Sequence, residues 1–337
     1  MSQSTRHIAE VHILVVFTNG GQVLLLQCPI FSLVPMDVFP VEIHSYICEL
    51  ACTDGGYTVR SLGLVSKYFR EIVHPFRYQS IAVSGHIQIS ELEHRLEKSL
   101  PHLRRVRNIF ISDGGKNDKL GVPIQRSAPH ISLLLGLVCS SVEKLTLHCD
   151  DPRTSTSLLA FLFGLHYPQL RELTVVGYYP FPHVPNAMPR LRYLHLNGNR
   201  NPHGLLQMGS LDVACPELTH LRISGLSRAA AFAAELAEAL TRVDSRKTLF
   251  NAKLPPNVRH IVVQPGLPTT MSGKFASARL TDDCMIEQLG NLVGDGKNSG
   301  VRFTLLKRHE CGDIAVTSRR LWMDSLEGRE KSWEVSA

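Results

Sequence analysis

The chain has 337 residues, of which 44% are hydrophobic and 20% charged, so it can bury a substantial core and is not disordered throughout. Its 36 Lys and Arg residues against 30 Asp and Glu give a net charge of +6 that is spread along the chain, which favours an ordinary solvated surface over a nucleic-acid-binding patch. The eight cysteines show no repeated CxxC spacing, and most lie in apolar periodic segments. They indicate reduced core thiols of a cytoplasmic or nuclear protein, without a disulfide framework or a metal site.

Residues 1–35 precede the first patterned segment. The stretch from Val11 to Met36 has no charged residue, but Thr18, Asn19, Gly20, Gly21 and Gln22 at its centre argue against a membrane-spanning helix or a signal peptide. One prediction is a strand, a Gly-Gly turn and a second strand. The alternative is that residues 1–35 are a spurious upstream extension, because Met36 lies three residues before the first motif.

Residues 36–78 have helical periodicity in short pieces. Pro40 suits the first position of a helix that ends at Gly55-Gly56. A second helix is expected over Thr58–Leu64, and a third from the N-cap Ser66 to His74-Pro75. Helices this short are unstable alone, so they must pack on one another or on a partner.

A repeated unit of the form Pro-x-Leu-x-x-Leu-x-Val/Leu follows. Its clearest starts, at residues 142, 170, 191 and 218, are 28, 21 and 27 residues apart, and the copy at 191 extends to Asn199 to complete the leucine-rich repeat pattern LxxLxLxxN. Helical segments are expected between the strands, over Ile131–Cys139, Ser157–Leu165 and Ala229–Leu240. The sequence therefore predicts an α/β fold in which residues 79–312 form an irregular solenoid, with a curved parallel sheet and helices on its convex side. Residues 313–337, with an amphipathic helix near Thr317–Leu326, are expected to cap the open end of the stack.

Alternation of side chains along the strands places the residues between the leucines on the face opposite the core. The rows predicted for this face hold a polar and aromatic set that we interpret as a candidate recognition surface, the alternative being an ordinary solvated side of the sheet. The set consists of Lys144, Thr146, His148, Glu172, Thr174, Tyr193, His195, Asn197, His220, Arg222, His260 and Gln264.

Catalytic motifs are missing from the sequence. It contains no GxxxxGK[ST], GxSxG or HExxH pattern, and no nucleophile or orienting carboxylate is placed beside the histidines of the predicted face. We therefore expect a protein that is not an enzyme and that binds no cofactor. An enzyme using the histidine-rich face would need a pocket with a nucleophile beside His195, His220 or His260.

The segment from Phe39 to Tyr78 resembles an F-box. Such a domain opens with a frame that stands here as Phe39-Pro40-Val41-Glu42-Ile43 and closes with one that stands as Leu64-Val65-Ser66-Lys67-Tyr68-Phe69-Arg70. Phe39 replaces the commoner Leu, and the loop Cys52–Tyr57 is longer and richer in glycine than in many members. The arrangement, with the tail Trp322–Gly328, is similar to F-box proteins with degenerate repeats that are abundant in mushroom-forming fungi.

This resemblance implies a substrate adaptor of a cullin-RING ubiquitin ligase, with residues 36–78 binding the Skp-type linker and, through it, the cullin, while the repeats hold a protein substrate. The linker-binding residues that it implies are Phe39, Pro40, Val41, Glu42, Ile43, Ile47, Leu64, Val65, Ser66, Lys67, Phe69 and Arg70. Each apolar member of this set could instead belong to the internal core of the three helices. The alternative function is a repeat scaffold that engages no ligase, and neither function requires a nucleic acid or a membrane.

Overall fold

The computed structural model of the protein describes residues 39–114, 127–207, 210–241, 249–268, 276–295, 300–308 and 313–328. The chain divides into two compact units, Met1–Pro40 and Val41–Ala337. Only Phe39 and Pro40 of the first unit are described, so the hairpin or extension expected over residues 1–35 lies outside the described residues. All the helices and strands given below belong to the second unit.

Three short helices open this unit, close to the predicted positions. They are α1 (Val41–Ala51), α2 (Tyr57–Val65) and α3 (Lys67–Val73), followed by the 3-10 helix His74–Phe76. Ser66 is the N-cap of α3, as predicted, and its Oγ accepts a hydrogen bond from the backbone N–H of Phe69 at 3.1 Å. α3 ends at Val73, and Pro75 lies in the 3-10 helix that follows.

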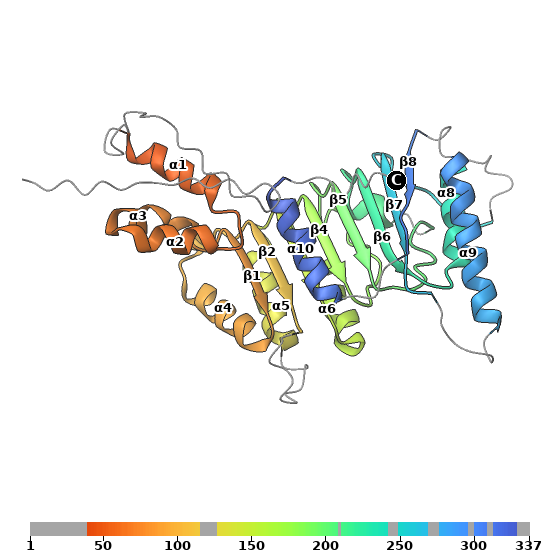
Figure 1. Ribbon diagram of the computed structural model, residues 1–337, viewed down its shortest axis with the longest axis horizontal. Helices are drawn as coiled ribbons and strands as arrows, with labels where there is room; N and C mark the ends of the chain where they lie inside the picture. The colour runs from red at the N-terminus through yellow and green to blue at the C-terminus, as the bar shows by residue number, and fades with distance from the viewer. Residues whose placement is uncertain are drawn as a thin grey trace, which may run out of the picture. The chain divides into compact units, whose positions relative to one another are not determined.

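The rest of the unit is built on one parallel sheet whose strands are hydrogen-bonded in sequence order (Figure 1). The strands are β1 (Ser80–Ser84), β2 (Asn108–Ser112), β3 (Lys144–His148), β4 (Glu172–Val176), β5 (Tyr193–Asn197), β6 (His220–Leu226), β7 (His260–Pro265) and β8 (Arg302–Leu305). Every strand pair is parallel, and the leucines of successive repeats face one another, as Leu145, Leu173 and Leu194 do. The predicted alternation of helix and parallel strand is confirmed.

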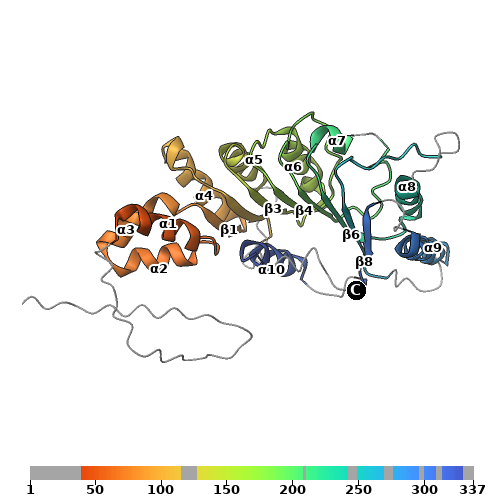
Figure 2. The same cartoon turned by 90° about the horizontal axis from the view of Figure 1, so that it is seen from above.

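Helices connect most of the strands. They are α4 (His86–Lys98), α5 (Ser127–Val138), α6 (Pro152–Gly164), the short α7 (Ser210–Ala214), α8 (Ala230–Thr241) and α9 (Ala276–Asp295), with a 3-10 helix at Pro101–Leu103. Figure 2 shows α4, α5 and α6 on one face of the sheet and α10 (Ile314–Leu326) on the other. The stack begins at β1 and α4, two strands before the repeat that starts at residue 142. β1 contains no leucine, so the leucine pattern does not mark this unit, although α4 buries Ile89, Leu92 and Leu96.

One continuous hydrophobic core lies between the sheet and these helices, from Val83 to Phe303. Successive turns stack closely where the strands end. Gly198 has φ 111°, and a Cβ at this position would lie 2.6 Å from the backbone oxygen of Gly177 in the preceding repeat. Only glycine allows that approach, so the tight turns keep the strands in register.

The position of α10 corrects the prediction that this helix caps the open end of the stack. α10 contacts β2 and β3, far from β8, and lies across the face that carries the predicted polar rows (Figure 1). The indole of Trp322 explains this position, since it is 3% exposed and its ring centroid lies 5.9 Å from that of Phe110 on β2. Phe110 is a large apolar side chain on a mainly polar face, and the indole covers it.

The six cysteines of the described residues are free thiols, and Cys48, Cys52, Cys149 and Cys215 are buried, as the sequence led us to expect. A search of the described helices finds none with the length and hydropathy needed to span a membrane.

Candidate functional site

Helix α1 carries apolar side chains on two sides. Ile43, Tyr46, Ile47 and Leu50 recur at helical spacing and are 44, 60, 54 and 61% exposed. On the other side, His44 and Cys48 are buried. A surface helix normally exposes polar residues on its outer side, so the exposed apolar stripe on this helix is unusual.

The next two helices extend this exposed surface. Leu64 and Val65 at the end of α2 are 81 and 54% exposed, and Tyr57 at its start is 76% exposed. The core of the three helices is small and consists of Cys48, Cys52, Val59, Ile72, Val73 and Phe76. We use the name outer apolar surface for Ile43, Tyr46, Ile47, Leu50, Leu64 and Val65. Its members take no part in that core.

The structure therefore separates interface candidates from core residues, which the sequence left open. Of the residues implied by the F-box resemblance, Phe69 is half-buried against the small core. The others are all exposed: Phe39, Pro40, Val41, Glu42, Ile43, Ile47, Leu64, Val65, Ser66, Lys67 and Arg70. The resemblance missed Tyr46, Leu50, Tyr57 and Tyr68, which are exposed too. The spacing of Tyr46 and Leu50 from Ile43 was the signal that could have identified them.

Polar contacts hold the three helices together. The Nε of Arg70 donates to the backbone oxygen of Gly63 at 3.2 Å, which ties α3 to α2. The Nδ1 of the buried His44 and the hydroxyl of Tyr68 share a hydrogen bond of 2.6 Å, which ties α1 to α3. These bonds fix the frame on which the outer apolar surface is displayed.

The second candidate site is the sheet face that carries the predicted rows. The strand register brings together Lys144, Glu172, Tyr193, His220 and His260 in one row. The next row contains Thr146, Thr174, His195 and Arg222, and a third contains His148, Asn197, Ser224 and Gln264. The rows are those predicted from the leucine spacing, because in-register parallel strands place equivalent positions side by side.

The rows interpreted as a candidate recognition surface are largely buried. Six of the twelve predicted residues are buried: Thr146, His148, His195, Asn197, Arg222 and His260. The other six, Lys144, Glu172, Thr174, Tyr193, His220 and Gln264, are half-buried. Polar groups at this depth bond to one another: the Nε2 of His195 lies 2.9 Å from Ser224 Oγ, and Arg222 Nη2 donates to Gln264 Oε1 at 3.0 Å.

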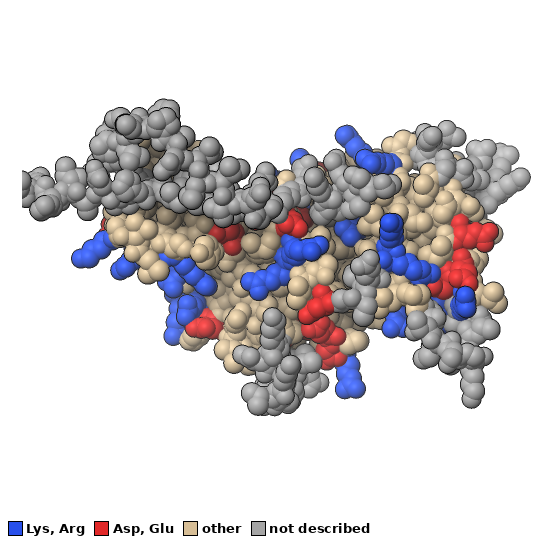
Figure 3. All heavy atoms as spheres, in the orientation of Figure 1, with Lys and Arg blue, Asp and Glu red and all other residues tan. Residues whose placement is uncertain are grey.

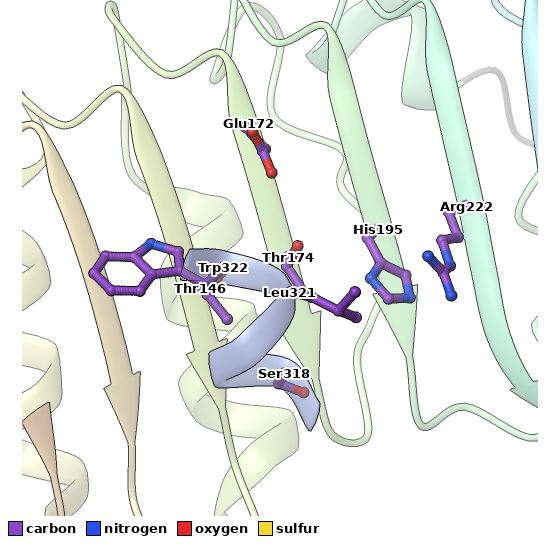
Figure 4. Close-up of a pocket in the computed structure, with 8 residues that line it drawn as sticks. All are labelled: Thr146, Glu172, Thr174, His195, Arg222, Ser318, Leu321 and Trp322. Carbon is purple, nitrogen blue, oxygen red and sulfur yellow. The ribbon is translucent and has the colours of Figure 1, made fainter. Parts of the chain in front are cut away.

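Aromatic packing and helix α10 account for much of the burial. The rings of Tyr193 and His220 stack with centroids 4.4 Å apart, and the rings of His220 and His260 meet edge to face at 5.8 Å. Figure 4 shows a cleft at the margin of α10, in which Leu321 is directed toward His195. The residues lining this cleft are Thr146, Glu172, Thr174, His195, Arg222, Ser318, Leu321 and Trp322.

Two serine–histidine pairs lie on this face. Ser224 pairs with His195, and Ser112 Oγ lies 3.2 Å from Nδ1 of His148, whose Nε2 is 3.3 Å from Oδ1 of Asp150. A serine, histidine and aspartate in this order would suggest acyl transfer, but Ser112 and Ser224 are each 1% exposed. A substrate has no access to hydroxyls at this depth, so the arrangement favours a structural role for both pairs.

Burial shifts the pKa of three groups on or beside the sheet face. Burial raises the pKa of Asp113 to about 6, although a hydrogen bond from the backbone N–H of Asp150 acts in the opposite direction. Burial lowers the pKa of His148, against the attraction of Asp150 and Asp313. Burial also lowers the pKa of Arg222 to about 10, so this guanidinium keeps its charge at neutral pH.

Charges of both signs are interspersed on the face that Figure 3 shows, with no single basic patch. Within the described ranges, no three His, Cys, Asp or Glu side chains are grouped so that they could hold a metal ion. Two candidate sites are therefore described: an apolar area on α1 and α2, and a semi-buried polar sheet face beside α10.

Comparison with known proteins gives no match, since no family model matches the sequence and no curated protein or solved structure is similar enough to count. The function has to be inferred from the residues and the geometry of these two surfaces.

Proposed function

We propose that the protein is a substrate adaptor of a cullin-RING ubiquitin ligase, in which α1–α3 are an F-box that docks on the Skp-type linker and the leucine-rich-repeat sheet binds a protein substrate. The observation that carries the proposal is the outer apolar surface. It lies on the segment whose two end frames resemble an F-box, and apart from Phe69 the apolar residues of those frames are exposed. Two independent features of one segment, its sequence and its exposure, thus support the same function.

Physical chemistry supports an interface on these helices. Covering exposed apolar area with a partner is favourable by about 25 cal/mol for each Å² removed from water. Glu42, Lys67 and Arg70 are exposed charged residues of the same helices, the type found at the rim of protein interfaces. The stripe on α1 has the i, i+3, i+4, i+7 spacing with which a helix contacts a partner's apolar groove.

The repeat sheet is the proposed substrate-binding part. Among the residues predicted for this role, the half-buried Tyr193, His220 and Gln264 keep area for contact with a partner, whereas the buried ones can support a surface but cannot form it. Aromatic side chains held rigid by stacking are good binding anchors, because little side-chain entropy is lost when they are covered. The adaptor proposal assigns no step of a chemical reaction to this chain.

The test is a binding titration of the full-length protein with a purified Skp-type linker from a mushroom-forming fungus. Val65→Asp places a charge within the outer apolar surface and should weaken binding about 100-fold. Leu280→Asp on α9 is the matched control, because Leu280 is 69% exposed and far along the chain from α1–α3, and it should change the affinity less than about twofold.

Two results would overturn the adaptor proposal. One is failure of the wild-type protein to bind any Skp-type linker under conditions where circular dichroism shows it folded. The other is an equal affinity for the two variants, which would mean that binding does not involve the outer apolar surface. Either result favours the alternative of a repeat scaffold whose first three helices end the stack.

A further inference from the structure

Helix α10 lies on the sheet face and reaches the α1–α2 loop. Its Trp322 packs against Phe110 of β2. A Cβ added to Gly55 in the α1–α2 loop would lie 3.6 Å from the indole Cζ3 and from the sulfur of Met323, which is van der Waals distance. Trp322 thus lies next to both parts of the proposed adaptor.

The C-terminal end of α10 is fastened to the sheet by hydrogen bonds. The Nζ of Lys144 on β3 donates to both the backbone oxygen and the Oγ of Ser325, each at 2.8 Å. The Oγ of Ser325 in turn donates to Oε2 of Glu172 on β4 at 2.7 Å. These charge-assisted bonds come from strands whose positions the repeat core fixes, so they give α10 a rigid footing.

The α1–α2 loop is bound to the first strand at the same place. The backbone N–H of Gly55 donates to Ser80 Oγ at 3.1 Å, and that hydroxyl donates to the backbone oxygen of Thr53 at 2.9 Å. Gly55 has φ 72°, a conformation that favours glycine, and a Cβ added there would be at ordinary van der Waals distance from the indole. The glycine-rich loop that sets this segment apart from many F-boxes therefore lies beside Trp322.

Without α10, few contacts in the described residues would hold the three helices to the sheet. The loop bonds to Ser80 would remain, with the bond from Gln79 Nε2 to the backbone oxygen of Glu49 at 2.8 Å and the ion pair of Arg107 and Glu49 at 2.8 Å. That ion pair is partly exposed and contributes little. Trp322 belongs to neither hydrophobic core, and its apolar area covers Phe110 on the sheet and lies beside the α1–α2 loop.

We propose that Trp322 is a positioning residue that fixes the orientation of α1–α3 relative to the repeat sheet. Its biological meaning rests on the proposed function, since a ligase adaptor must hold its substrate at a set position from the linker. The indole is suited to a wedge because it is large, flat and 3% exposed. Its Nε1 is buried with no hydrogen-bond partner among the described residues, which means that the ring acts through its shape.

The test measures the distance distribution across the joint in the full-length protein. Spin labels are attached to native Cys284 on α9, which is exposed, and to Arg60→Cys on α2, with Cys28, Cys139 and Cys311 replaced by Ser. Double electron–electron resonance should give a narrow distribution of label-to-label distances for this protein when Trp322 is intact. Trp322→Ala should broaden it at least about twofold, because the two parts become free to rotate about Ser80.

Two further variants distinguish positioning from general destabilisation. Trp322→Phe keeps an aromatic wedge and drops the buried N–H, so it should retain the narrow distribution. Ile314→Ala, at the other end of α10, is the matched control, because Ile314 is 44% exposed and should leave the distribution unchanged. An unchanged distribution in Trp322→Ala would overturn the proposal, as would equal broadening in Trp322→Phe and Trp322→Ala.

If Trp322→Ala does not fold, as judged by circular dichroism, Trp322→Leu takes its place. It keeps an apolar side chain and removes the flat ring, so a broadened distribution supports the proposal and a narrow distribution overturns it. Linker affinity is measured on the same proteins to separate the two proposals. Absence of linker binding in the wild type contradicts the proposed function alone, while the distance measurement still tests the joint.

Discussion

The three N-terminal helices and the repeat sheet use apolar side chains in opposite ways. In α1–α3, six residues form the core, while Ile43, Ile47 and Leu64 are 44, 54 and 81% exposed. In the sheet, the apolar side chains of the repeats lie in one continuous core, and even the polar face opposite is largely buried. The three helices leave apolar side chains exposed, whereas the repeats bury theirs. This difference is expected between a part that binds a partner and a part that folds by itself.

This contrast predicts that stability resides in the sheet. Phe232 on α8 is fully buried in the continuous core, so Phe232→Ala should lower the free energy of unfolding by about 3–5 kcal/mol. Urea titration followed by circular dichroism measures the change. Phe161→Ala on α6 is the control, because Phe161 is 42% exposed and should cost less than about 1 kcal/mol. Equal losses in the two variants would contradict the assignment of the core.

The second prediction concerns a buried carboxylate behind the sheet. Glu235 on α8 is fully buried and accepts hydrogen bonds from the backbone N–H groups of Gly204 and Leu206, at 2.7 and 2.6 Å. Its Oε2 also lies 3.0 Å from Nδ1 of His203. Glu235→Gln puts an amide N–H where an acceptor is needed and should cost about 2–3 kcal/mol by the same titration. Glu287→Gln, at an exposed position of α9, should be neutral.

The third prediction concerns a substitution that should raise the free energy of unfolding. Because burial raises the pKa of Asp113 to about 6 from 3.8, the folded state binds more protons than the unfolded state between these values. Asp113 therefore weakens the fold progressively as pH rises from 4 to 6, and fully above pH 6. Asp113→Asn removes this cost and keeps an acceptor for the N–H of Asp150, so it should stabilise the protein by about 1–2 kcal/mol at pH 7.5.

The pH dependence checks the cause. The difference between Asp113→Asn and the parent should shrink toward zero at pH 4, measured as urea midpoints in matched buffers. The neighbouring His148, whose pKa burial lowers, titrates in both proteins, so its effect cancels to first order. A gain that is the same at both pH values would show that packing, not the buried charge, is responsible.

The smallest change in the free energy of unfolding is expected in α1–α3. Leu64→Ser removes an exposed leucine and should change the free energy of unfolding by less than about 0.5 kcal/mol. Val59→Ser, in the small core of the same helix, should cost about 2 kcal/mol. Thermal unfolding of both variants would compare the two sides of α2 directly. A large loss for Leu64→Ser would mean that the outer apolar surface stabilises the fold.

The sequence by itself determined the local elements and the rows of the sheet. Helical spacing, the Ser66 cap and Pro75 located the three helices, and the leucine spacing gave the register that aligns Lys144 with Glu172 and Tyr193. Both results follow from short-range rules, because periodicity decides which side a residue faces. The spacing of Ile43 and Leu50 could also have revealed the full stripe on α1.

Only the tertiary structure decided which apolar residues of α1–α3 are core, how deeply the sheet face is buried, and where α10 lies. The bond between Lys144 and Ser325 joins residues 181 positions apart, and no local pattern specifies such a pairing. The amphipathic pattern of α10 predicts that one face is buried, but it does not specify against which residues. Trp322 of α10 packs on Phe110 beside Gly55, and these two residues come together only after the sheet and the α1–α2 loop have folded.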